Sequence, residues 1–285
     1  MVLFSRTVLF LIAVGDGVAP SGDWCPFGSY IRAALAYGSG VLASNVLSFP
    51  SWASGDVVGE FFDPVSGRLL LIARPAAQPD LWAAFVDGAR VSYAQHGVEG
   101  ALDYDGVRDG LSSSLFVAAV EHDGRVVGGL RVQGPYTRVE QTAALGEWAG
   151  RAGTTELRRQ IGRRLGAGAI EVKAVWVDRD ADRHDALTAV LARMFVHLLT
   201  VMNVRYAFCT AAEHAVQRWQ SSGGVVSTEV PAVAYPDERY QTLLMWWDRH
   251  NAFTRMTGQQ GRAVLRESTR LHPLATVAAG SPWVA

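Results

Sequence analysis

Apolar residues recur at regular spacings between residues 68 and 248. The strongest pattern is an apolar stripe that repeats every three and four residues, which predicts the buried face of a helix. Its members are Leu187, Val190, Leu191, Met194, Phe195, Leu198 and Met202. Short apolar runs predict strands at 69–74, 114–120, 126–132, 170–177, 206–210, 225–229 and 240–247. Further helical patterns cover 80–94, 154–165, 213–221 and 251–271.

The order of these elements combines hairpins with helical crossovers. The sequence HDGR at 122–125 predicts a hairpin turn, and helices between strands predict parallel pairs. We therefore expect an α/β domain over residues 67–248, with a mixed, twisted sheet flanked by helices. Residues 1–66 are rich in Gly, Ser and Ala and are expected to form an N-terminal extension with one helix at 30–47. Residues 249–285 are expected to form a helical tail.

Composition narrows the class of protein. The chain has 285 residues, of which 49% are hydrophobic and 19% charged, so a sizeable core forms and global disorder is excluded. A formal net charge of −1 provides no general attraction to nucleic acid or to an anionic membrane. The two cysteines, Cys25 and Cys209, provide neither a disulfide framework nor a zinc-binding spacing, so we expect no metal.

The first 16 residues contain a short apolar run behind a single Arg. The run is too short to span a bilayer. A weak signal peptide and a packed N-terminal strand both fit it, and the absence of a clear cleavage site favours the strand. We therefore expect a cytoplasmic protein with no membrane span; its oligomeric state stays open.

The stretch AAEHAVQRWQSSGG, from Ala211 to Gly224, resembles the GNAT-family motif N-x-x-A-x-x-x-Y-x-x-x-G-F. Ala215 and Gly223 fall in register with it, and Trp219 stands at the Tyr position. In many members of that family the Tyr protonates the leaving thiolate. An indole N–H is not a proton donor of that kind, so the resemblance assigns no general acid here.

A second stretch is similar to the N-terminal half of acyl-homoserine-lactone synthases. Those enzymes have an Arg-x-x-aromatic helix end, an acidic-aromatic-acidic turn and a hairpin ending in Gly-x-x-Arg. The matching residues are Arg90, Tyr93, Asp103, Tyr104, Asp105, Gly128 and Arg131. The next strand of that family carries Glu-x-x-Arg, where Glu171 matches and Ala174 replaces the Arg.

Together the two resemblances imply a thioester-dependent N-acyltransferase of the GNAT fold, in the autoinducer-synthase and N-acyl-amino-acid-synthase branch. They imply transfer of a medium or long acyl chain to the amine of an amino acid or a similar small molecule. The donor would be an acyl carrier protein or acyl-CoA, a co-substrate and not a tightly bound cofactor. Two alternatives stay open: an acetyl-CoA-dependent N-acetyltransferase, and a non-catalytic domain that binds an acyl group or a protein.

The resemblance also suggests catalytic and donor-binding residues. We expect a half-exposed Glu171 to act as general base, so that Glu171→Gln lowers the rate at least tenfold with little change in stability. His214 is the second candidate, whereas His197 is expected to be structural. The strand at 170–177 would present backbone N–H groups to the thioester; the donor-binding residues would be Val175, Trp176, Val177, Arg179 and Arg183.

Two charged groups complete the predicted site. Arg90, Asp103, Asp105 and Arg131 are expected to form an ionic cluster that orients the substrate or braces a helix against the sheet. In the basic helix at 154–165, Leu157, Ile161 and Leu165 would face inward. The outward face would present Arg158, Arg159, Arg163 and Arg164 near the mouth of the cleft, either to an acyl carrier protein or to solvent only.

Overall fold

The computed structural model describes residues 57–271, which contain one nine-stranded sheet. Its strand order is β1-β2-β3-β4-β5-β6-β9-β7, and β8 also pairs with β9. The strands are β1 (Gly59–Asp63), β2 (Arg68–Ala73), β3 (Leu115–Val120), β4 (Val126–Gln133), β5 (Ala169–Val177), β6 (Tyr206–Ala212), β7 (Val225–Val226), β8 (Val233–Ala234) and β9 (Gln241–Asp248). The expected helix at 30–47 and the apolar N-terminal run lie outside the described residues.

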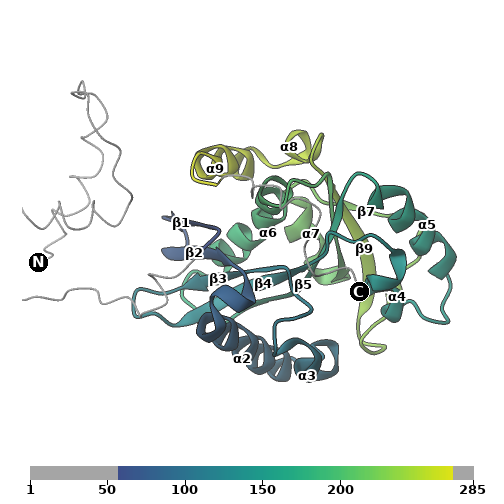
Figure 1. The fold of residues 1–285 in the computed structure, drawn as a ribbon, viewed down its shortest axis with the longest axis horizontal. Coiled ribbons are helices and arrows are strands. Elements are labelled where there is room, and N and C mark those ends of the chain that lie inside the picture. Colours follow the sequence, from purple (N-terminus) through teal and green to yellow (C-terminus); the bar gives the residue numbers. More distant parts are fainter. Residues whose placement is uncertain (1–56, 272–285) are drawn as a thin grey trace, which may run out of the picture. The chain divides into compact units, whose positions relative to one another are not determined.

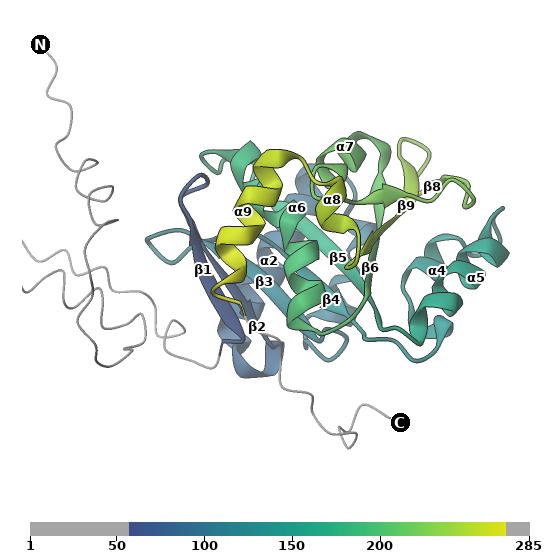
Figure 2. The ribbon, with the colours of Figure 1, turned by 90° about the horizontal axis from the view of Figure 1, so that it is seen from above.

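Helices cover both faces of the sheet (Figure 1). One face of the sheet is covered by α2 and α3 and, over β6 and β9, by α4 and α5. The other face is covered by α6, α8 and α9 (Figure 2). The helices are α2 (Pro79–Gln95), α3 (Tyr104–Val107), α4 (Ala144–Glu147), α5 (Thr154–Leu165), α6 (His184–Val201), α7 (Val216–Gln220), α8 (Ala252–Arg255) and α9 (Gly258–Ser268).

Within this sheet β5 and β6 form a parallel pair, joined by the crossover helix α6, and the other pairs are antiparallel. The HDGR turn closes the β3–β4 hairpin, where Glu121 N donates to Arg125 O over 2.9 Å. The expected mixed sheet flanked by helices is thereby confirmed.

The apolar stripe on α6 faces the core as predicted. Its residues from Leu187 to Leu198 are completely buried, and Met202 is partly buried against the same cluster. By length and composition α6 is apolar enough to cross a membrane, but 67% of the helix is buried inside the protein. Packing against the sheet therefore accounts for its apolar character.

The limits of several elements differ from the sequence predictions. The sheet begins at Gly59, because β1, which the sequence did not predict, pairs along its whole length with β2. The expected strand at 225–229 is only two residues long, and the expected helix at 213–221 is a 3₁₀ turn followed by α7. The C-terminal tail is two helices, α8 and α9, of which α9 packs on α6.

A buried ionic cluster joins β1, α6 and α9. Arg193 of α6 donates to Glu267 of α9 at 2.7–2.9 Å and to Asp63 of β1 at 2.7 Å. His197, one turn further along α6, lies 2.8 Å from the Glu267 carboxylate and is 2% exposed, which confirms its structural role. The hydrogen bonds of Arg193 therefore connect three segments that are far apart in the sequence.

We expect Arg193→Leu to lower the free energy of unfolding by roughly 3–5 kcal/mol, because Asp63 and Glu267 lose their buried cation. Urea denaturation followed by circular dichroism measures the change. Arg239→Leu is the matched control. Its side chain is 60% exposed and its contacts with Asp237, Gly97 O and the Tyr240 ring lie at the surface, so its midpoint should move little. Equal midpoints for the wild type and Arg193→Leu would contradict the proposed role of Arg193 in joining β1, α6 and α9.

Candidate functional site

The central feature of the site is the separation of β5 from β6. The two strands pair only at Ala169–Glu171 with Tyr206–Phe208, although β5 continues to Val177 and β6 to Ala212. Beyond that point their facing edges have no ladder partner among the described residues. A cavity of about 350 Å³ occupies the gap.

A bulge in β5 shapes this gap. Ala174 has φ +48°, and the pairing of β4 with β5 shifts register beside it. Ile170 and Val172 point into the core beneath α6, but Ala174 and Trp176 point into the core beneath α2. The bulge interrupts the alternation of faces, so Lys173 and Ala174 share the α2 side of the sheet.

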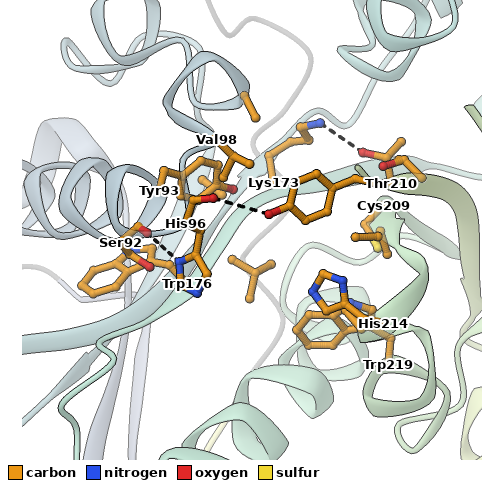
Figure 3. Close-up of a pocket in the computed structure, with 18 of the residues that line it drawn as sticks. Ser92, Tyr93, His96, Val98, Lys173, Trp176, Cys209, Thr210, His214 and Trp219 are labelled. Carbon is orange, nitrogen blue, oxygen red and sulfur yellow. Dashed lines mark hydrogen bonds between the residues drawn. The ribbon is translucent and has the colours of Figure 1, made fainter. Parts of the chain in front are cut away.

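The cavity runs between the two faces of the sheet. From the α6 side it is lined by Thr188, Leu191 and Trp219, and from the α2 side by Ser92 and Tyr93. Figure 3 shows Lys173 and Thr210 at one end, with the imidazoles of His96 and His214 on opposite sides. The described residues that line the cavity include Lys173, Arg218 and three histidines but no Asp or Glu. The cavity is therefore suited to ligand oxygens and not to cations.

Lys173 is the buried cation of this cavity. Its Nζ donates to Glu147 of α4, and to Thr210 Oγ1 of β6 over 3.2 Å. Burial lowers the pKa of Lys173, but the carboxylates of Glu147 and Glu171 outweigh it, so the pKa lies above its ordinary value. The ammonium therefore stays charged and spans the opening between the two strands.

Three imidazoles line the cavity, at His96, His184 and His214. His96 ends α2, and its Nδ1 lies 2.8 Å from the backbone oxygen of Ser92. A carbonyl accepts only, so Nδ1 carries the proton in the neutral ring and Nε2 is an acceptor. His214 was expected at the site and does line the cavity; its ring lies 6.1 Å from that of Tyr240. Among the three, only His96 has its tautomer fixed by a hydrogen bond to a described residue.

Glu171 is not the half-exposed carboxylate that we expected, and that prediction is wrong. It is 0% exposed, and its oxygens accept from Tyr136 Oη and from the backbone N–H groups of Ala143 and Ala144, each at 2.9 Å. Burial raises its pKa, and the cation of Lys173 opposes that effect. Glu171 does not line the cavity, so this geometry does not support a role as general base.

The expected donor-binding residues divide into two groups. Val175, Trp176 and Val177 line the cavity, whereas Arg179 is exposed outside it. Arg183 precedes α6 with φ +58° and donates to Val65 O over 3.2 Å, so its side chain also lies outside the cavity. Among the described residues no side chain caps the first turn of α6, so its first backbone N–H groups have no side-chain acceptor there.

The expected ionic cluster around Arg131 does not form. Arg131 is buried and donates to Ser113 Oγ at 3.1 Å, while Asp103 and Asp105 are exposed and make no ion pair with it. Exposed carboxylates such as these retain their hydration. The buried guanidinium donates through Nη1 to the hydroxyls of Ser112 and Ser113, and its Nε has no partner among the described residues. Arg90 instead lies 5.2 Å from the ring of Tyr104, a contact that joins α2 to α3.

The basic helix α5 has the predicted inward face, with Leu157 and Ile161 buried and Leu165 partly buried. Its arginines project outward as expected, but none of them lines the cavity, and their docking to a carrier protein stays a prediction. Three of the four arginines have partners on the protein: Arg158 pairs with Glu140, Arg159 pairs with Glu156 and Glu229, and Arg164 lies over the ring of Trp246. Among the described residues, only Arg163 has neither an ion pair nor a ring contact.

Two residues of the cavity were not anticipated. Lys173 could have been singled out from the composition, because it is the only lysine in a chain with 25 arginines. His96 follows Ser92 by four residues at the expected end of a helix, a spacing that allows the imidazole to contact the Ser92 carbonyl. Glu147 could not be found in this way, because only the fold brings α4 over β5.

The sheet order, the crossover helix α6 and the separated parallel pair define an α/β domain with the arrangement expected from the resemblance to the GNAT fold. No protein-family model matches the chain. It is 43% identical over 202 residues to the uncharacterized protein Rv1356c of Mycobacterium tuberculosis (strain ATCC 25618 / H37Rv), across 71% of this chain and 77% of that protein. The uncharacterized protein Mb1391c of Mycobacterium bovis (strain ATCC BAA-935 / AF2122/97) matches equally. The chain belongs to the family of these mycobacterial proteins.

Solved structures with a similar fold are distant in sequence. FeeM, an N-acyl amino acid synthase from uncultured soil microbes, is 12% identical and superimposes with a TM-score of 0.49, over 66% of this chain and 96% of its own. The acyl-homoserine-lactone synthase LasI is 13% identical with a TM-score of 0.45, over 67% of this chain and 98% of its own. These similarities concern the fold alone.

We expect Glu171→Gln to destabilise the protein by roughly 1–3 kcal/mol, because the carboxamide NH₂ replaces an acceptor among three buried donors. Chemical denaturation measures the loss. Glu140→Gln is the control, since the Glu140 side chain is 63% exposed and pairs only with Arg158. If Glu171→Gln unfolds at the wild-type midpoint, the carboxylate does not hold the segment around α4.

Proposed function

We propose that the protein is a thioester-dependent N-acyltransferase that moves an acyl group onto the amine of a small molecule inside the β5–β6 cavity. The carboxylate-free cavity between the separated strands carries this proposal. An extended thioester arm laid between β5 and β6 meets two open strand edges, whose backbone groups pair with amides as an added strand does. The α6 side then receives the donor, and the α2 side receives the amine.

The reaction needs a base close to the attacking amine. His96 is the residue that we assign, because its Nδ1 is held by Ser92 O and its Nε2 is left as an acceptor beside the cavity. His214, on the opposite side, is the alternative base. Trp219 occupies the cavity wall where the GNAT motif carries Tyr, so no hydroxyl acid at that position protonates the thiolate.

For the donor we favour acyl-CoA over an acyl carrier protein. The first residue of α6, His184, lines the cavity, so the N-terminus of that helix, which also carries Asp185 in its first turn, borders the donor side. Backbone N–H groups at such a terminus bind phosphate. The four arginines of α5 lie away from this opening. The apolar wall formed by Leu191, Val175 and Trp219 suits a medium or long acyl chain, and the family resemblance supports an amino acid as acceptor.

Acyl transfer can be tested by incubating the protein with octanoyl-CoA and a panel of amino acids and following N-octanoyl products by mass spectrometry. We expect product with the wild type and at least tenfold less with Ala212→Trp, because the indole fills the end of the cavity. Ala149→Trp is the matched control, since Ala149 is exposed and outside the cavity, and it should act as the wild type does. Product formation that is unaffected by Ala212→Trp would place the reaction elsewhere.

The base assignment gives a separate prediction. With a verified amine, His96→Gln should lower kcat by roughly 10²-fold and flatten the rise of the rate with pH, because the amine loses its proton acceptor. His214→Gln should have a smaller effect. Steady-state kinetics across a pH series measures both, and the reverse order of effects would transfer the base role to His214.

A further inference from the structure

The ammonium of Lys173 has one donor that the protein does not use. An ammonium has three N–H groups, and among the described residues Lys173 has two acceptors, Glu147 on α4 and Thr210 on β6. These acceptors lie on different elements on either side of the strand gap. Because Lys173 lines the cavity, with 15% of its side chain exposed, the third N–H is available to a ligand there.

The residues around the third N–H of Lys173 favour a ligand oxygen as its acceptor. No Asp or Glu lines the cavity among the described residues, so no carboxylate within the cavity competes for it. Lys173 also precedes Ala174, whose left-handed backbone places the two residues on the same side of the sheet, at the point where the strands part. In this largely dry setting an ionic hydrogen bond is stronger than it is in water.

The choice of lysine agrees with this geometry. The chain uses arginine at 25 other cationic positions and lysine only here. A guanidinium presents its donors in a planar fork, which suits a single carboxylate, whereas an ammonium directs three donors to three separate acceptors. Glu147, Thr210 and one ligand oxygen are three such acceptors.

We propose that Lys173 stabilises the oxyanion that develops on the thioester carbonyl; this inference rests on the proposed function. The amine nitrogen attacks the carbonyl carbon, a C–N bond forms, and the π pair moves onto oxygen, which accepts the third N–H of Lys173. When the oxyanion collapses, the C–S bond breaks and the thiolate leaves. The proton of the amine passes to the base. Lys173 itself keeps its protons throughout.

The other reading of Lys173 is a brace between α4 and the sheet. Lys173→Met alone leaves the buried Glu147 without its cation and is expected to lose stability for that reason. The double variant Lys173→Met/Glu147→Gln removes both charges together, and a melting curve establishes that it folds. Glu147→Gln alone retains the ammonium and measures the loss that follows from the missing counter-ion. Glu140→Gln is the matched control, because the Glu140 side chain is 63% exposed and lies outside the cavity.

The first test uses kinetics with S-octanoyl-pantetheine and a verified amine. In the double variant we expect kcat to fall by roughly 10²–10³-fold, as for the loss of one oxyanion donor, with little change in the KM of either substrate. Glu147→Gln should lose less activity than the double variant, because it retains the ammonium, and Glu140→Gln should keep the wild-type kcat. An unchanged kcat in the double variant would overturn the inference. A rise in the KM of carboxylate-bearing amines alone would also overturn it, by assigning Lys173 to the acceptor.

The second test needs no turnover. Protein labelled with ¹⁵N-lysine has a single side-chain amine signal, because Lys173 is the only lysine. Adding S-octanoyl-pantetheine should shift this signal, whereas S-octyl-pantetheine, a thioether without the carbonyl, should leave it in place. Equal shifts, or none with either probe, would refute the contact. A carbonyl-specific shift without acylation of any amine would reject the proposed function and retain the oxygen site.

Discussion

The buried carboxylate of Glu171 is the interaction on which the site depends. It stands in the last paired position of β5 and β6, opposite Phe208, and its three hydrogen bonds hold Tyr136 and the start of α4 against the strand at that point. The insert between β4 and β5 is thereby fixed where the sheet opens. A charged group is suited to this task because two backbone N–H groups and a hydroxyl converge on it, and a neutral side chain cannot accept from all three without exposing an unpaired donor.

The position of α4 determines the electrostatics of the cavity. Once α4 lies over β5, Glu147 reaches Lys173 and holds its ammonium across the strand gap. The negative charges of Glu147 and Glu171 stay behind the cavity wall, and only the cation faces the ligand. The buried charges of Lys173, Glu147 and Glu171 lie close together within the protein, as their burial requires. A ligand in the cavity nevertheless meets a positive potential. The same arrangement excludes Lys173 as a base and makes it a donor.

The sequence predicted the elements that have a periodic apolar pattern, but it missed features that depend on tertiary contacts. The stripe from Leu187 to Met202 identified α6, because one face of a core helix must be apolar along its length. The edge strand β1 was missed, since its five residues include two carboxylates, and one of them, Asp63, is buried only because Arg193 reaches it. The site followed the same division. The strand at 170–177 was expected at the site, but the burial of Glu171 depends on backbone donors about thirty residues earlier in the chain, which no local pattern reveals.

The departure from the Glu-x-x-Arg pattern has a structural explanation. The pattern would place a cation at Ala174, but here that residue forms the bulge, with φ +48°, and the cation is one residue earlier. In a regular strand a shift of one residue would carry Lys173 to the opposite face. The bulge interrupts the alternation, so positions 173 and 174 both face α2, and a cation at either reaches the same opening. The chain therefore keeps a positive charge at the strand gap although the motif that would announce it is lost. A comparison of motifs, which finds only Ala174 at the position of the Arg, does not reveal this charge.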